Sequence, residues 1–135
     1  LRRGPQEPTD QTVCAFYSAL LSCLRDPVFR EGDWRLLPCR PAWTGNWTSE
    51  CFLAYAWCGK KGEKRLIAVN DSDHASQCFV TMPWLDLEEE TWLLSDRLGS
   101  AVYERKGCDL VSQGLYLDMS AWSYHVFQLE ARSKT

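Results

Sequence analysis

The chain has 135 residues and a mass of 15.5 kDa, enough for one domain with a single hydrophobic core. Its net charge of −3 and its few basic clusters argue against nucleic-acid binding, because phosphate binding needs a concentrated Lys/Arg surface. No apolar run approaches the ~20 residues that cross a bilayer, so we expect neither a nucleic-acid nor a membrane partner.

The first part of the chain predicts one amphipathic helix behind an extended lead-in. Asp10 offers an N-cap, and the residue before Pro27 disfavours helical geometry, so the helix is expected from Asp10 to Arg25. Apolar side chains recur between these limits at helical spacing. They are Val13, Phe16, Tyr17, Leu20, Leu21 and Leu24.

The rest of the chain predicts short β-strands separated by turns. Residues 50–58 carry apolar side chains on both faces, which indicates a central strand, and a Gly-Lys-Lys-Gly turn pairs them with 65–70 as a hairpin. The other expected strands are 34–37, 76–81, 91–95, 101–104, 109–111, 114–119 and 122–129, the last two as a closing hairpin.

Short strands at this spacing are typical of an antiparallel β-sandwich, here of about eight strands. The fold class is therefore mainly β, with one N-terminal amphipathic α-helix. We divide the chain into a lead-in and helix over residues 1–29 and a β-sandwich domain over residues 30–135.

Several segments, taken in order, resemble the C-terminal β-sandwich of alpha-amylase-superfamily glycoside hydrolases. Residues 16–29 are similar to the last barrel helix and its exit loop, and 52–57 to the first long sandwich strand. Residues 66–73 resemble a hydrophobic strand followed by an Asn-x-Ser-Asp turn. Residues 92–105 and 115–127 resemble later strands and the end of that sandwich.

The resemblance implies a sandwich that stands behind a catalytic barrel, and a lead-in and helix over residues 1–29 whose helix is a remnant of the last barrel helix. A (β/α)8 barrel needs roughly 250 residues, more than this chain has. In the superfamily all three catalytic carboxylates lie on barrel strands, so no catalytic residue carries over. The implied role is non-catalytic: a free-standing or excised domain that acts in structure or interaction.

Other chemical motifs are weak. The carboxylates in turns and loops, among them Asp71, Asp73 and Asp86, are expected to be solvated, and His74 and His125 to be structural. Seven cysteines form no CxxC pair and are expected to be small buried thiols. We expect no metal site and no cofactor. A small enzyme with an unrecognised cleft remains an alternative.

Six of the seven tryptophans divide into two groups. Trp57, Trp92 and Trp122 lie on expected strands and are predicted to fill the core. A second group lies on expected loops, where the rings either cap one end of the sandwich or form a carbohydrate platform with weak glycan affinity. This group contains Trp43, Trp47 and Trp84.

The helix raises the question of partners. In water its apolar stripe would drive association. We therefore expect the helix either to fold back onto the sandwich or to form a homodimer or bind a partner protein. The first residues contain no apolar signal-peptide core, which predicts a cytoplasmic protein.

Overall fold

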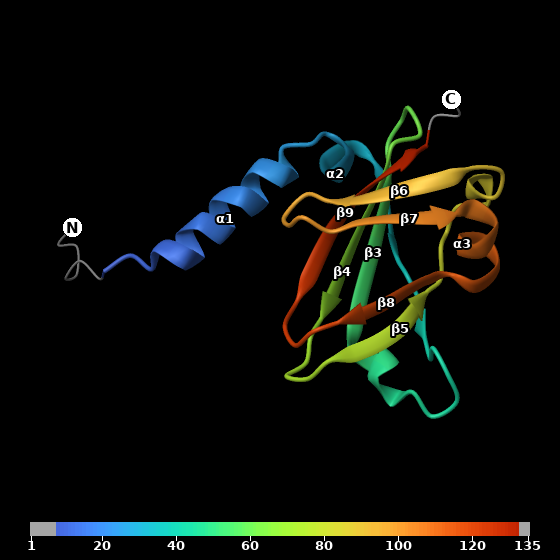
Figure 1. The fold of residues 1–135 in the computed structure, drawn as a ribbon. Helices are drawn as coiled ribbons and strands as arrows, with labels where there is room; N and C mark the ends of the chain where they lie inside the picture. Colours follow the sequence, from blue (N-terminus) through green and yellow to red (C-terminus); the bar gives the residue numbers. More distant parts are fainter. Residues whose placement is uncertain (1–7, 133–135) are drawn as a thin grey trace.

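Two antiparallel sheets build the protein in a computed structural model that describes residues 8–132 (Figure 1). The larger sheet contains, in spatial order, β1 (Asp33–Leu36), β3 (Phe52–Cys58), β4 (Lys64–Asn70), β9 (Tyr124–Ala131), β6 (Thr91–Asp96) and β7 (Val102–Lys106). The smaller sheet contains β2 (Cys39–Arg40), β5 (Ser76–Val80) and β8 (Leu115–Met119). The predicted mainly-β sandwich with an N-terminal helix is confirmed.

Residues 8–132 also contain three α-helices and two 3-10 helices. They are α1 (Gln11–Leu24), α2 (Val28–Glu31), η1 (Trp47–Cys51), η2 (Leu85–Leu87) and α3 (Gly107–Gln113), of which α1 and α2 precede the first strand. Figure 1 shows α1 extending from one side of the sandwich, whereas α3 lies at the opposite side and joins β7 of one sheet to β8 of the other.

Helix α1 begins where the sequence predicts. The Asp10 carboxylate accepts hydrogen bonds from the backbone N–H groups of Thr12 at 3.0 Å and Val13 at 3.2 Å, which satisfies donors that have no partner inside the helix. The helix ends one residue before the predicted limit of Arg25, ahead of the Asp26-Pro27 step.

The core lies between the two sheets. Its centre consists of side chains from both sheets and from α3 that are almost completely buried, and Trp92 packs among them as predicted. The largest apolar side chains with less than 2% exposure are Leu66, Val80, Leu87, Leu94, Leu110, Leu115 and Phe127.

Two strand predictions are wrong. Residues 109–111 belong to helix α3, whose first turn is packed so tightly that a Cβ at Gly107 would meet the Leu87 carbonyl. Residues 114–129 contain two strands but no hairpin, because β8 pairs with β5 whereas β9 pairs with β4 and β6. The chain crosses between the sheets at Trp122, a non-glycine residue with φ of 56°.

The two other strand tryptophans depart from the predicted core positions. Trp122 is 61% exposed at the crossing between the sheets. Trp57 is half-buried on the outer side of the larger sheet, where its ring packs edge-on against Phe29 of α2 at 5.1 Å. Trp57 points outward because successive side chains of a strand point to opposite faces and its neighbour Ala56 points into the core.

Over β1, β3, β4 and the first half of β9, the outer side of the larger sheet, facing away from β2, β5 and β8, is mostly apolar. Cross-strand pairing aligns Leu36 with Tyr55, Tyr55 with Ile67, and Ile67 with Val126 in one row over four strands. Neighbouring rows place Trp34 beside Trp57, and Val69 between Leu53 and Tyr124. We call the exposed part of this surface the outer sheet face; it consists of Trp34, Leu36, Leu53 and Tyr124.

Helix α1 covers only part of this side of the sheet. Phe16 packs edge-on against Tyr124 at 5.1 Å, Leu20 is half-buried and Cys23 is buried. The rest of the predicted stripe faces solvent. The helix therefore contacts the sheet through one row of side chains only. We call the exposed part the helix stripe; it consists of Val13, Tyr17, Leu21 and Leu24.

Candidate functional site

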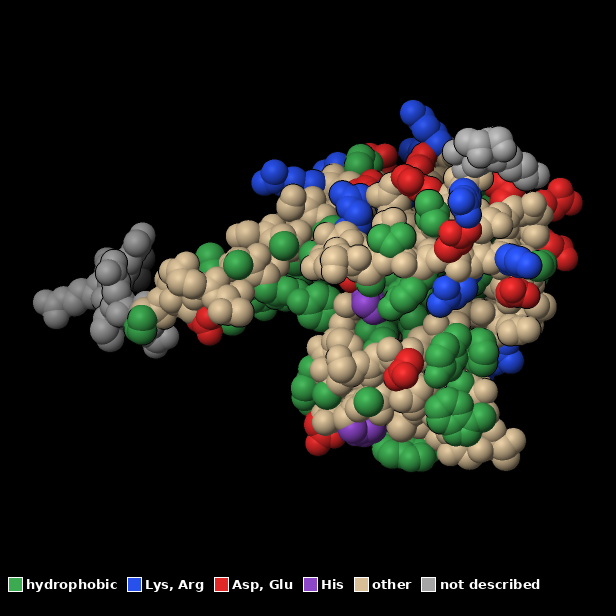
Figure 2. Space-filling view, in the orientation of Figure 1, with side chains coloured by type: hydrophobic (Ala, Val, Ile, Leu, Met, Phe, Trp, Pro, Cys, Tyr) green, Lys and Arg blue, Asp and Glu red, His purple; other side chains and the backbone are tan. Residues whose placement is uncertain are grey.

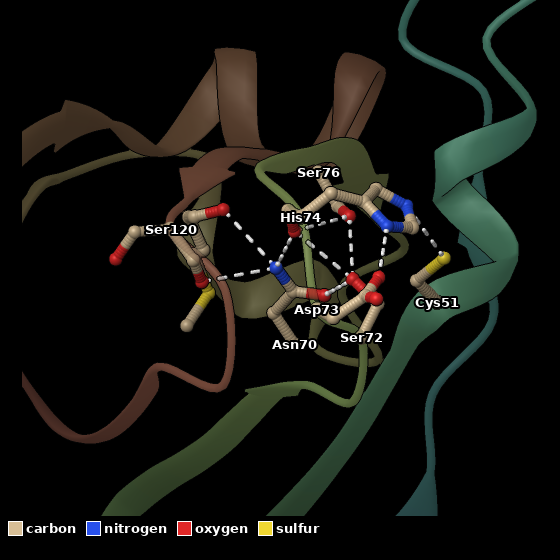
Figure 3. Close-up of polar contacts among 8 residues, drawn as sticks. Cys51, Asn70, Ser72, Asp73, His74, Ser76 and Ser120 are labelled. Carbon is tan, nitrogen blue, oxygen red and sulfur yellow. Dashed lines mark hydrogen bonds and ion pairs between the residues drawn. The ribbon is translucent and has the colours of Figure 1, made fainter.

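The best-organised polar cluster lies where β4 turns into β5 (Figure 3). Asn70 ends β4 and is completely buried. Its Nδ2 lies within hydrogen-bonding distance of the carbonyl oxygens of His74 at 2.9 Å, Met119 at 3.1 Å and Ser120 at 3.0 Å. One amide side chain therefore fixes the turn to the end of β8.

Serine hydroxyls complete the support of this turn. Ser72 Oγ donates to Asn70 Oδ1 at 2.7 Å and lies 3.1 Å from Ser76 Oγ. The His74 carbonyl is also within 3.0 Å of Ser72 Oγ and 3.3 Å of Ser76 Oγ. The backbone of His74 is thus held by several neighbours, which restricts where its ring can lie.

The imidazole of His74 lies between a carboxylate and a thiol. Its Nδ1 is 2.9 Å from Asp73 Oδ1, and its Nε2 is 3.7 Å from Cys51 Sγ. Because a carboxylate accepts, Nδ1 carries a proton and Nε2 of the neutral ring is free to accept from the thiol. The hydrogen bond from His74 and its charge hold the pKa of Asp73 below the usual range.

The thiol comes from a different part of the chain. Cys51 ends η1, directly before β3, and its carbonyl accepts from the Asp71 N–H at 2.9 Å, which ties η1 to the turn. Trp47 of the same 3-10 helix packs against the His74 ring with centroids 5.1 Å apart. A base that is oriented by a carboxylate and lies beside a thiol is an arrangement that can activate a nucleophile.

Sequence reasoning did not find this cluster. Asp73 was expected to be solvated, and it is exposed, while His74 was expected to be structural. One feature of the sequence does point to this cluster. Pairing residues 50–58 with 65–70 as a hairpin places Cys51 next to the turn that follows β4. Nothing in the spacing of Cys51 and His74 along the chain indicates that their side chains meet.

The second histidine has a structural setting. His125 Nδ1 lies 2.8 Å from Asp96 Oδ2, and its ring stacks on Phe127 at 4.8 Å. The other oxygen of Asp96 accepts from the N–H groups of Leu98 at 3.0 Å and Val126 at 3.1 Å. Asp96 and His125 therefore fasten the β6–β7 loop to β9.

The three loop tryptophans do not form one platform. Trp47 lies near the start of β3, whereas Trp84 lies above Lys64, 5.8 Å from ring centroid to Nζ, and Lys64 pairs with Cys58 at the far end of β3. Trp43 lies in the loop that leads into η1, and Trp47 is the first residue of η1. The Asn46 side chain accepts from the Ala42 N–H within this loop, and both rings are well exposed, at 51% and 64%.

Two pockets lie elsewhere on the protein. One of about 360 Å³ lies between α2 and the β3–β4 hairpin, and charged side chains including Asp26, Glu31 and Arg65 line it. Another of about 200 Å³ is lined by residues that include Arg35 and Trp84. Neither pocket includes Cys51 or His74.

The cysteines are all reduced, and their burial is mixed. Cys23 and Cys78 are buried as predicted, but Cys14 and Cys108 are exposed, so the prediction of buried thiols is wrong for these two. A hydrogen bond with Cys78 lowers the pKa of Cys39, and the same bond together with burial raises the pKa of Cys78.

No family model and no curated protein matches the chain. Among residues 8–132, no three or more Cys, His, Asp or Glu side chains are arranged to hold a metal ion. The helices of the same part of the chain are too short or too polar to cross a membrane.

Proposed function

We propose that this chain is a non-catalytic β-sandwich domain with a structural and interaction role, of the type found behind the barrel of alpha-amylase-superfamily enzymes. Its sequence resemblance to that domain suggests the type. The single observation that carries the interaction role is the apolar surface left open by the fold, the outer sheet face together with the helix stripe.

The size of this surface supports docking. Leu21 is 60% exposed on the helix, and Trp34 and Leu36 are 54% and 59% exposed on the sheet. With on the order of 100 Å² open on each half-exposed large side chain, the two surfaces together offer on the order of 800 Å². A stable protein–protein interface buries about that area on each partner.

The charge pattern points the same way. Among the outward residues of β1, β3 and β4, Arg65 is the charged one, and its Nε is already paired with Asp26 Oδ2 at 2.8 Å. A surface that only met water would carry more charged side chains, because large exposed apolar patches promote association. The occupant is therefore apolar: a second copy of the chain or a partner protein.

Sedimentation velocity over a micromolar concentration range tests this function. We expect the native chain to associate and Leu36→Glu to shift it toward monomer, because the new carboxylate would be desolvated in the interface. Leu85→Glu is the matched control, since Leu85 is 78% exposed on η2, outside both surfaces. A native chain that stays monomeric and binds no hydrophobic dye would contradict the proposal.

A second candidate function, weak glycan binding, is favoured by the exposure of Trp43 and Trp47, which lie four residues apart at the start of η1. Sugar rings stack on exposed aromatic faces, so maltooligosaccharide binding would quench their fluorescence. Titration of the native chain and of Trp43→Ala at millimolar sugar measures this. Equal signals from both proteins would argue against a role for Trp43.

A further inference from the structure

We propose that Cys51 is a reactive thiol that His74 and Asp73 activate for exchange with small cationic disulfides, forming a mixed disulfide on the protein. This inference does not depend on the interaction role, because its residues belong neither to the outer sheet face nor to the helix stripe.

The geometry supplies each part of an activated thiol. The base is close, with His74 Nε2 3.7 Å from Cys51 Sγ, and it is oriented, with Nδ1 2.9 Å from Asp73 Oδ1. It is also held in place, since the His74 carbonyl accepts from the buried Asn70 amide and lies within 3.3 Å of the hydroxyls of Ser72 and Ser76 (Figure 3). Positioned general bases contribute about 10²- to 10⁴-fold to rates.

The exchange balances with no other reactant. The Cys51 thiol gives its proton to His74 Nε2, and the sulfur attacks one sulfur of the disulfide. The disulfide S–S bond breaks as the new S–S bond forms, and the leaving thiolate takes the proton back from His74. One thiol and one disulfide are consumed, and one thiol and one mixed disulfide are produced.

Accessibility and charge indicate the class of partner. Cys51 is half-buried and the His74 side chain is 39% exposed, so a small flexible molecule can reach the sulfur, while neither pocket described above lies here to seat a large substrate. The charged residues on the two segments that meet are acidic, and β3 and β5, which pack beside them, carry none. Strand β2, which also packs against η1, carries Arg40, but its guanidinium lies over the Phe79 ring and donates to the Gln113 carbonyl. The acidic residues are Glu50, Asp71 and Asp73. This field favours a cationic disulfide over an anionic one.

The test is exchange of the full chain with cystamine, a small disulfide with two amino groups, followed at each cysteine by peptide mass spectrometry. The exposed Cys14 and Cys108 serve as references in the same molecule. At about pH 7 we expect Cys51 to react about tenfold faster than either reference, since a nearby base raises the reactive fraction of the thiol.

Variants separate activation from simple exposure. His74→Gln should slow Cys51 by about tenfold or more and leave Cys14 and Cys108 unchanged. Asp73→Asn, at an exposed position, should also slow Cys51, because an amide no longer fixes the ring tautomer. Asp71→Asn is the matched control, because it removes one charge of the same acidic field without removing the hydrogen bond to the His74 ring. It should slow Cys51 less than Asp73→Asn does.

The pH profile is the readout that a merely structural role would not move. Between about pH 8 and about pH 6, an ordinary thiol slows about tenfold per pH unit as its thiolate fraction falls. We expect Cys51 to slow less than this in the native chain and to follow the ordinary profile in Asp73→Asn and His74→Gln. The proposal is overturned if Cys51 reacts no faster than Cys14 and Cys108, or if the folded Asp73→Asn and His74→Gln proteins keep the native rate and profile.

Discussion

Asn70 shows how much one side chain can determine in this fold. It is 0% exposed, its Nδ2 reaches three backbone carbonyls, and its Oδ1 accepts from Ser72. Those carbonyls belong to the turn after β4 and to the end of β8, which lie in different parts of the sequence. Asn70 therefore joins the two sheets at one end through polar contacts, while the core joins them through apolar ones.

Removing the amide should be costly. Asn70→Ala leaves buried carbonyl groups without donors, and we expect it to lower the free energy of unfolding by about 3 kcal/mol. Asn70→Asp keeps the shape but loses the donors, so it should destabilise similarly at neutral pH. Urea denaturation measures both, with the exposed Ser112→Ala as control. A loss below about 0.5 kcal/mol in both variants would contradict this role.

At the scale of elements, the sequence predicts what depends on neighbours along the chain. The α1 helix and the β3–β4 hairpin follow from periodicity and turn residues, and both are confirmed. The pairing of the last two strands cannot be predicted in this way. The alternation of apolar and polar residues in 115–119 and 124–129 fits a hairpin as well as it fits two strands in different sheets. Side-chain contacts such as Cys51 with His74 depend on packing between segments and leave no local pattern.

One ion pair fastens the α1–α2 junction to the larger sheet. Asp26 Oδ2 lies 2.8 Å from Arg65 Nε, and both side chains are mostly buried. Burial by itself would raise the pKa of Asp26, but hydrogen bonds from the Val28 N–H and from Arg65 outweigh it and hold the pKa below its usual range. The charged carboxylate is therefore favoured in the folded state over the unfolded one.

This pair predicts a pH dependence. A depressed carboxyl pKa contributes stability that is complete above the unfolded value of about 3.9 and is lost as pH falls through the lower folded value. Asp26→Asn should cost about 2 kcal/mol at pH 7, because it leaves Arg65 without its partner. The gap from the native chain should narrow below about pH 4. Guanidinium unfolding at both pH values measures this, with exposed Glu88→Gln as control; a gap that stays constant would be inconsistent with it.

For the whole molecule, the question is how the two apolar surfaces relate. Figure 2 shows hydrophobic side chains along α1, a helix that extends beyond the sandwich. The helix supplies an apolar stripe that its own sheet covers only in part, and the sheet supplies an apolar face that its own helix covers only in part. A second copy could pair each stripe with the other copy's sheet, which is a closed two-fold arrangement.

Double substitution tests whether the surfaces form one interface. Leu21→Glu changes the helix stripe and Leu36→Glu changes the outer sheet face, and both positions are exposed, so each should alter folding stability by less than about 0.5 kcal/mol. If one interface contains both, either substitution alone disrupts it, and the double variant should dissociate little more than the stronger single one. Association constants from sedimentation equilibrium measure the coupling, and fully additive effects would show that the stripe and the sheet face bind separately.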